Sequence, residues 1–199
     1  CIIRPSEKKE VIYGLPEGIS GISLEIVDGG VMDGVTISNV VMEGPEVPLF
    51  IRLGNRARPH MEEAPKPGVG VLRNVSIRQV VAKGAGKTGC SITGIPGHRV
   101  QGVSIRNLQM ELEGGVTDPV SPDGVPELEE QYPESTMFGV LPASVFYLRH
   151  ASGIDLHHIR AEFREKDQRV HVLAEDVEEF RYSAIAVKGL ETPGIQILE

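Results

Sequence analysis

The amino-acid sequence predicts an all-β protein whose fold is a right-handed parallel β-helix, a solenoid of stacked coils. A twelve-residue motif returns along the chain, apolar and polar residues alternate within it, and glycine- and proline-rich stretches separate the copies. The clear copies are VMDGVTISNVVM (31–42), VLRNVSIRQVVA (71–82) and VQGVSIRNLQME (100–111), and the weaker ones are SGIDLHHIRA (152–161) and VEEFRYSAIAV (177–187). Repeats of this size cannot bury their apolar faces alone and therefore must stack.

The spacing of the copies predicts the coils. The first inward-facing apolar residues are Val35, Val75, Val103, Ile154 and Phe180, which follow one another by 40, 28, 51 and 26 residues. The short spacings fit one coil, and the long ones fit a coil plus an insertion at 57–70 or 114–142. A sandwich or barrel would need hairpin turns every 8–12 residues and no fixed register. We therefore predict a single domain over 1–199, with about five to six coils and two long insertions.

The first regular strand lies in ISGISLEIVDGG (19–30). Ile22, Leu24 and Ile26 alternate with Ser23, Glu25 and Val27, which predicts that the first set faces the core and the second faces outward. The Asp28-Gly29-Gly30 sequence is typical of a turn and ends this strand.

The next strand is PLFIRLGNR (48–56). Leu49, Ile51 and Leu53 are expected to face the core, while Phe50 and Arg52 face outward. The long insertion at 114–142 contains many prolines, which exclude a long helix. A loop of that length is either functional or disordered.

One column of the aligned motif is polar. Four residues after each alignment position stand Asn39, Gln79, Asn107, His158 and Ala184. Stacked about 4.8 Å apart, the first four could form a ladder of side-chain hydrogen bonds along the coils. Alternatively, asparagine is simply common where a strand turns. In either case the column is structural.

The composition argues against several classes of function. The formal net charge of −8 argues against nucleic acid as a partner. No apolar run approaches the roughly 18 residues that a membrane span needs, and no signal peptide is visible. Cys1 and Cys90 are too few for a disulfide framework, and Cys90 is expected to be buried. Because the chain opens on cysteine, we expect preceding material to be missing.

Several segments resemble bacterial proteins related to the polygalacturonases, glycoside hydrolase family 28. They are GISLEIVDGGVMDGVTISNVVM, PLFIRLGNR, ITGIPGH, YPE…MFGVLPA and YLRH, between about Gly18 and Phe180, and they are similar to the C-terminal half of such proteins. The resemblance implies a right-handed β-helix, pectin-type acidic polysaccharide as substrate, inverting hydrolysis by carboxylates, and an extracellular or periplasmic location. The family's Asn-Thr-Asp, Asp-Asp, Gly-His-Gly and Arg-Ile-Lys motifs do not occur here as written, and Ser23-Leu24-Glu25 stands where Arg-Ile-Lys would be expected.

Glu25 and Asp28 are the candidate catalytic pair. Inverting hydrolysis needs an acid and a base about 6.5–9.5 Å apart, and three residues of extended chain separate two backbones by roughly 10 Å. Asp28 also suits a purely structural role at its turn. The predicted activity is hydrolysis of acidic polysaccharides; the alternative is a non-catalytic β-helix that binds glycan or serves as a structural module.

The candidate substrate-binding residues surround this pair. Arg52 lies 27 residues after Glu25, one coil on, so the two are predicted to be neighbours. A guanidinium fork matches the carboxylate of a sugar acid, but a Glu25–Arg52 cross-strand ion pair explains the pattern equally well. The full set is Arg52, Asn55, Arg56, Glu134, Tyr147 and Arg149.

Two other patterns predict no site. His150, His157 and His158 are close in sequence but lack a fourth ligand at metal-binding spacing, so no metal is predicted. GAGKTG (84–89) lacks the full phosphate-loop spacing and no helix follows it, so no cofactor is predicted.

Overall fold

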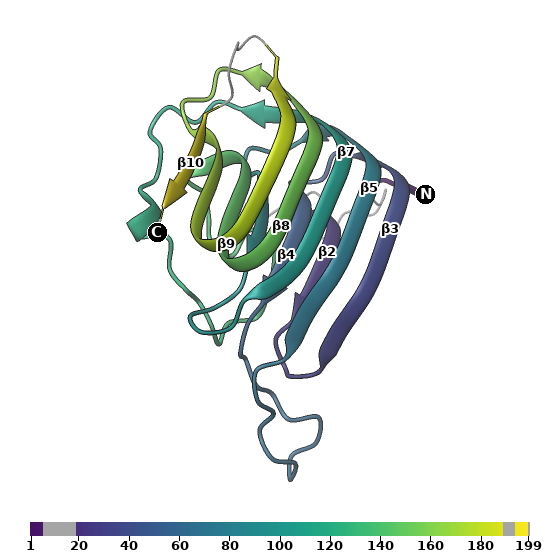
Figure 1. Ribbon diagram of the computed structural model, residues 1–199, viewed down its shortest axis with the longest axis vertical. Coiled ribbons are helices and arrows are strands. Elements are labelled where there is room, and N and C mark those ends of the chain that lie inside the picture. Colours follow the sequence, from purple (N-terminus) through teal and green to yellow (C-terminus); the bar gives the residue numbers. More distant parts are fainter. Residues whose placement is uncertain (6–18, 189–193, 199) are drawn as a thin grey trace.

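The computed structural model describes residues 1–5, 19–188 and 194–198, and this part of the chain is built almost entirely from parallel β-strands (Figure 1). The strands are β1 (Ile2–Ile3), β2 (Ser20–Ile26), β3 (Val31–Glu43), β4 (Val47–Leu53), β5 (Val71–Ala85), β6 (Cys90–Thr93), β7 (Val100–Gly114), β8 (Ala143–Glu165), β9 (Val170–Val187) and β10 (Ile195–Leu198). The only helical element in the described residues is a short 3-10 turn at Pro122–Gly124.

The strands form one sheet that nearly closes on itself. The hydrogen-bonded path runs from β1 through β3, β5 and β7 to β8, and returns through β6 and β4 to β2. The closure depends on β8, which pairs with β7 along one part and with β6 along another. Beyond β8 lie β9 and then β10. Every strand pair is parallel, so the prediction of an all-β, parallel architecture is confirmed.

The register matches the alignment predicted from the repeated motif. Val35 pairs with Val75, Val75 with Val103, Val103 with Ile154, and Ile154 with Phe180. The curved strands β3, β5, β7, β8 and β9 therefore lie side by side in Figure 1, each carrying one copy of the motif. Equivalent residues stack on one another because the copies pair in the same frame.

Stacked apolar columns fill the interior. Ile77, Ile105 and Leu156 are register neighbours and fully buried, and the predicted inward residues Leu49, Ile51 and Leu53 are buried as well. Each such side chain contributes roughly 1.5–3 kcal/mol relative to leaving it in water. Two apolar residues that the sequence predicts to face outward, Val27 and Phe50, are buried. Val27 is buried, because it lies just beyond the end of β2 and packs toward Gly54.

Two bends in each motif copy explain the polar column. Asn39, Gln79, Asn107, His158 and Ala184 all have positive φ angles between 51° and 58°. A second bend column, one residue before each alignment position, consists of Gly34, Asn74, Gly102, Gly153 and Glu179. Glycine and asparagine tolerate this left-handed conformation best. No side-chain hydrogen bond joins the members of the first column in the described chain, so the predicted ladder is wrong and the turn interpretation is correct.

We expect Ala184→Asn to stabilise the protein, because alanine adopts the left-handed conformation at position 184 with strain that asparagine reduces. The expected gain in unfolding free energy is about 0.5–1 kcal/mol, measured by urea denaturation. Ala186→Asn is the matched control, since Ala186 is also exposed but has no positive φ. An equal effect of both substitutions would contradict the strain argument.

The two insertions differ in what they contact. The 57–70 segment extends away from the strands at the bottom of Figure 1. Residues of 114–142 instead pack on the outer face of the sheet. Val125 and Leu141 form a small apolar cluster with Tyr147 and Leu173, and Phe138 packs against it. This second cluster means that the outer face of these strands is not open to solvent.

A buried ion pair ties several loops together. The side chains of Arg169 and Asp167 are 0% and 1% exposed, and their closest charged atoms are 2.8 Å apart. The Arg169 guanidinium also donates hydrogen bonds to the carbonyl oxygens of Lys87, Thr88, Leu141 and Ala143. One arginine thus joins the segment before β6, the end of the 114–142 insertion and the start of β9.

Two further sequence expectations can be compared with the described residues. Cys90 is fully buried, as predicted, and burial raises the pKa of its thiol to about 12. No helix in the described part of the chain has the length and apolar character needed to cross a bilayer.

Candidate functional site

A polar row crosses the sheet face on which the sequence places its candidate residues. Glu25, Arg52, Thr93, Arg149 and Glu175 are successive register partners on β2, β4, β6, β8 and β9. The one-coil spacing therefore predicted correctly that Glu25 and Arg52 are neighbours. However, the structure shows no ion pair between these two residues. Glu25 accepts a hydrogen bond from the Ser23 hydroxyl instead.

Arg52 is 1% exposed and its donors are used within the chain. Nη1 donates to the Gly94 carbonyl oxygen at 2.8 Å, and Nη2 donates to the carbonyl oxygens of Glu127 at 2.7 Å and Leu128 at 3.3 Å. The Phe138 ring covers the guanidinium, with 5.3 Å between the guanidinium carbon and the ring centroid. Burial lowers the pKa of Arg52 to about 10, so it remains charged at neutral pH.

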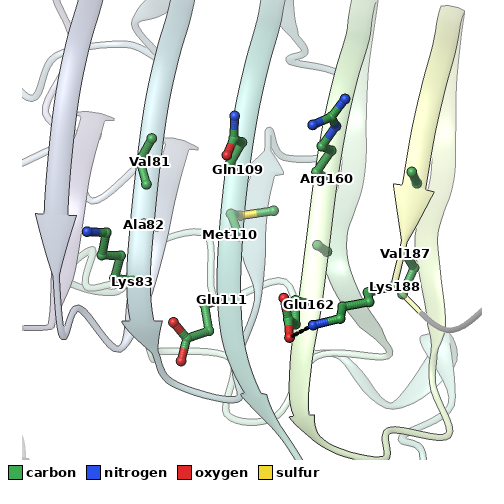
Figure 2. Close-up of a pocket in the computed structure, with 12 residues that line it drawn as sticks. Val81, Ala82, Lys83, Gln109, Met110, Glu111, Arg160, Glu162, Val187 and Lys188 are labelled. Carbon is green, nitrogen blue, oxygen red and sulfur yellow. Dashed lines mark hydrogen bonds and ion pairs between the residues drawn. The ribbon is translucent and has the colours of Figure 1, made fainter.

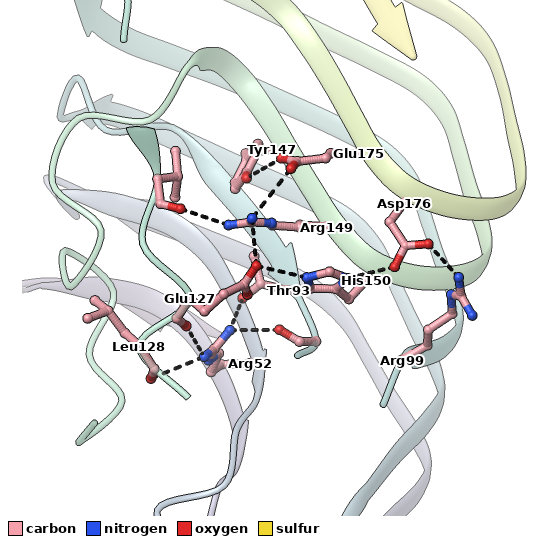
Figure 3. Close-up of polar contacts among 12 residues, drawn as sticks. Arg52, Thr93, Arg99, Glu127, Leu128, Tyr147, Arg149, His150, Glu175 and Asp176 are labelled. Atoms are coloured by element: carbon pink, nitrogen blue, oxygen red, sulfur yellow. Dashed lines mark hydrogen bonds and ion pairs between the residues drawn. The ribbon is translucent and has the colours of Figure 1, made fainter. Parts of the chain in front are cut away.

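Arg149 lies at the centre of a wider network, shown in Figure 3. Its Nη1 donates to the Val125 carbonyl oxygen at 2.9 Å, and its Nη2 lies 2.5 Å from a Glu127 carboxylate oxygen and 3.4 Å from one of Glu175. The Tyr147 hydroxyl donates to Glu175 at 2.8 Å. Burial, with the Glu175 hydrogen bond second, raises the pKa of Tyr147, so the phenol stays protonated.

His150 continues the network toward the next strands. Its two ring nitrogens lie 3.1 Å from Glu127 and 2.6 Å from Asp176, and Arg99 lies 2.5 Å from the same Asp176 carboxylate. The 114–142 insertion therefore lies across the row and contacts it through Glu127. As a result, Arg52, Tyr147 and Arg149 contact the chain itself rather than an open groove, and the Glu25–Arg52 ion pair considered from the sequence is replaced by contacts with the insertion.

Sequence reasoning missed Glu127, Glu175 and Asp176. Glu175 could have been found, because it follows Arg149 by 26 residues, the same spacing that separates the motif positions Ile154 and Phe180. Glu127 could not have been found, since the insertion carries no repeat from which its position can be read.

A second polar cluster surrounds the other catalytic candidate, Asp28. Arg56 donates to Asp28 from Nε at 3.0 Å and also from Nη2, and the Arg58 backbone N–H donates at 2.9 Å. The Arg58 side chain lies 3.7 Å away and is 71% exposed. The Arg56 hydrogen bond, opposed by partial burial and reinforced by Arg58, lowers the pKa of Asp28. Asp28 is therefore ionised at neutral pH.

The Asp28 cluster borders a hollow of about 230 Å³. Its lining consists of Asp28, Arg58, Pro59, His60, Pro65 and Pro67. Because Arg56 and Arg58 already occupy the Asp28 carboxylate, its oxygens have little free capacity for a water molecule. The exposed guanidinium of Arg58 is the group that this hollow, which we call the Asp28 pocket, presents to a ligand.

The remaining candidates lie around these clusters. Asn55 donates its backbone N–H to the Glu129 carbonyl oxygen, so its backbone contacts the insertion. Arg56 stacks over Tyr132 of the insertion, with 5.0 Å from the guanidinium carbon to the ring centroid. Glu134 accepts hydrogen bonds from the backbone N–H and hydroxyl of Thr136, within the insertion.

A different hollow lies on another face, away from every candidate residue. It measures about 380 Å³ and crosses β5, β7, β8 and β9 between Val81 and Lys188 (Figure 2). Its Glu162 pairs with Lys188, and its Glu111 pairs with Arg164. Its other two charged residues, Lys83 and Arg160, form no ion pair in the described residues.

No group of histidine, cysteine, aspartate and glutamate side chains in the described residues could hold a metal ion. Comparison with known proteins adds no relative: no protein-family model, no curated protein and no solved structure matches this chain.

Proposed function

We propose that this protein is a right-handed parallel β-helix that binds acidic polysaccharide at the Asp28 pocket without hydrolysing it. The observation that carries this proposal is the paired state of Asp28, whose carboxylate holds Arg56 and Arg58 in place. Such a carboxylate orients cations and is poorly placed to activate water. The exposed Arg58 guanidinium can then take the carboxylate of a sugar acid in two hydrogen bonds.

The parallel register supports the β-helix. Strand partners recur 26 to 51 residues apart with the same motif frame, as stacked coils with insertions require. A parallel strand, crossover and parallel strand connection is right-handed in nearly all known cases. The resemblance of these segments to polygalacturonase-type proteins supports both the handedness and an acidic glycan as ligand.

The second candidate function is inverting hydrolysis of pectin-type polysaccharide. It is favoured by one feature of the structure: Glu25 and Asp28 lie at the end of β2, which is an end of the sheet path, and both are partly accessible. Asp28, being ionised, would act as the base, and Glu25 would have to supply the proton.

Incubating the chain with polygalacturonate and rhamnogalacturonan fragments distinguishes the two functions. We expect binding with no release of reducing ends. We expect Arg58→Ala to weaken binding about tenfold, because it removes a charged hydrogen-bond donor, while the melting temperature stays nearly unchanged. Arg4→Ala is the control, since Arg4 is similarly exposed and paired but contacts Glu43.

Release of reducing ends that disappears in Glu25→Gln or Asp28→Asn would instead establish the hydrolase. Release that survives both substitutions would exclude this carboxylate pair as its source. Unchanged affinity in Arg58→Ala would show that the Asp28 pocket does not bind the sugar acid.

A further inference from the structure

A row of polar and basic side chains crosses the outer face of the repeated motif, on the segment between its two bends. Ser38, Arg78, Arg106, His157 and Ser183 are successive register partners on β3, β5, β7, β8 and β9. Arg78 and Arg106 are exposed and His157 is half-buried. Since neighbouring strands lie about 4.8 Å apart, the three groups stand next to one another. We call Arg78 and Arg106 the cation row; His157, whose ring is hydrogen-bonded to Ser183, borders it.

Two other exposed arginines on these strands are each matched by a partner of opposite sign. Arg73 pairs with Asp33 and Arg181 pairs with Asp155, both at 2.8 Å. In contrast, no carboxylate pairs with Arg78 or Arg106 in the described part of the chain, and Arg106 donates only to the Ser104 hydroxyl. Like charges directly opposite each other on adjacent strands destabilise a sheet. The protein therefore keeps two unpaired arginines side by side although its net charge is −8.

The surface around the cation row is rich in hydroxyl groups. The neighbouring outward column begins Thr36, Ser76 and Ser104, and the column that contains the cation row ends in Ser38 and Ser183. The single carboxylate in these two columns, that of Asp155, is already paired with Arg181. Short hydroxyls suit hydrogen bonding to a polyhydroxylated chain. The two columns contain no phenylalanine, tyrosine or tryptophan ring on which a nucleic-acid base could stack, and no apolar residue that could anchor a peptide side chain.

We propose that the cation row is a second glycan-binding surface, which takes a linear carboxylated polysaccharide laid across strands β5, β7 and β8. The guanidinium groups of Arg78 and Arg106 each bind a carboxylate of the polysaccharide, and the serine and threonine hydroxyls bind its hydroxyl groups. The surface shares no residue with the Asp28 pocket, so an experiment can disprove either binding site without disproving the other. Its effect would be to hold a long acidic polymer at two places on one protein.

The test uses the double variant Arg78→Ser/Arg106→Ser, which gives both positions the residue found at Ser38 and Ser183. The probe is a linear galacturonate oligosaccharide, with binding measured by calorimetry in an Arg58→Ala background so that the Asp28 pocket contributes little. We expect affinity to fall about tenfold or more, since two charged hydrogen-bond donors are lost. The melting temperature should stay the same or rise, because a like-charge contact is removed.

The control is Lys83→Ser/Lys188→Ser, which removes the same charge from β5 and from the residue that follows β9, at the hollow on a different face. It should leave affinity nearly unchanged. An equal loss of affinity in both double variants would overturn the proposal, because it would show that net charge alone explains the loss. Unchanged affinity in Arg78→Ser/Arg106→Ser would overturn it as well. Tighter binding of polyglutamate or a single-stranded oligonucleotide than of the uronate would overturn the assigned ligand class.

Discussion

Arg169→Ala is expected to destabilise the protein by about 3–5 kcal/mol, because it leaves the Asp167 carboxylate buried without its partner. The same change also removes the donor that serves the carbonyl oxygens of Lys87, Thr88 and Leu141. For a chain of this size, the expected fall in melting temperature is roughly 10 °C. Differential scanning calorimetry together with urea denaturation measures both quantities.

Arg181→Ala is the matched control for this prediction. Its ion pair with Asp155 has the same 2.8 Å separation as the Arg169–Asp167 pair, but the arginine side chain is 65% exposed. Exposed pairs of this kind contribute little to stability, because water and salt screen them. A similar loss of unfolding free energy in both variants would show that burial does not determine how much the Arg169–Asp167 pair stabilises the protein.

The buried pair also predicts how the difference in stability between wild type and Arg169→Ala varies with pH. Burial alone would raise the pKa of Asp167, but the hydrogen bonds from Arg169 outweigh it and the pKa is lowered. A carboxyl group with a lowered folded pKa contributes stability above its ordinary value of 3.8, and that contribution is lost as the pH falls through the folded pKa. The stability difference between wild type and Arg169→Ala should therefore be full at neutral pH. It should shrink as the pH falls, first through the raised pKa of the buried, unpaired Asp167 of the variant and then down to the lowered pKa of Asp167 in the wild type.

The repeated motif made the all-β, parallel architecture predictable in some detail. Aligning Val35 with Val75, Val103, Ile154 and Phe180 reproduces the strand register of the structure. This worked because each copy of the motif buries its apolar residues beside those of the copy before it, so periodicity and register follow from one physical requirement. The bends were also present in the sequence, as a glycine or asparagine one residue before four of the five positions, although they were not recognised there.

The candidate site was less predictable, because it depends on a segment that does not repeat. Alternation placed Arg52 on the outer face correctly, and an outward side chain is normally a solvent-exposed one. Here the 114–142 insertion covers it, and Glu127 and Leu128 supply the acceptors. Where an insertion packs depends on particular side-chain contacts rather than on periodicity. The sequence therefore predicted the row of residues but not what lies over it.

Covering the row has a consequence for function. The Asp28 pocket and the cation row are the two places where arginine side chains of the described chain gather at an accessible surface near hydroxyl or carboxylate groups. In contrast, Arg52 and Arg149 donate hydrogen bonds to the insertion. Ligand-binding experiments should accordingly respond to Arg58, Arg78 and Arg106, whereas stability experiments should respond to the covered arginines.

Arg52→Ala is therefore expected to act on stability and on the insertion. The substitution leaves the carbonyl oxygens of Gly94 and Glu127 without their donor and removes the cation beneath Phe138. Buried polar groups left unpaired cost about 1–3 kcal/mol each, so we expect a total loss of roughly 3 kcal/mol. Amide hydrogen exchange across 114–142 should accelerate, while exchange in β5 and β7 stays protected.

Two further variants make the Arg52 prediction sharp. Arg164→Ala removes an exposed ion pair with Glu111. It should change the unfolding free energy by no more than about 0.5 kcal/mol, and it should leave amide exchange in the insertion unchanged. Glu127→Gln should loosen the insertion without touching Arg52 directly, because it weakens the contacts of that carboxylate with Arg149 and His150. If exchange in 114–142 is unchanged in both Arg52→Ala and Glu127→Gln, the apolar cluster of Val125, Leu141 and Tyr147 holds the insertion, and its polar contacts with the row are incidental.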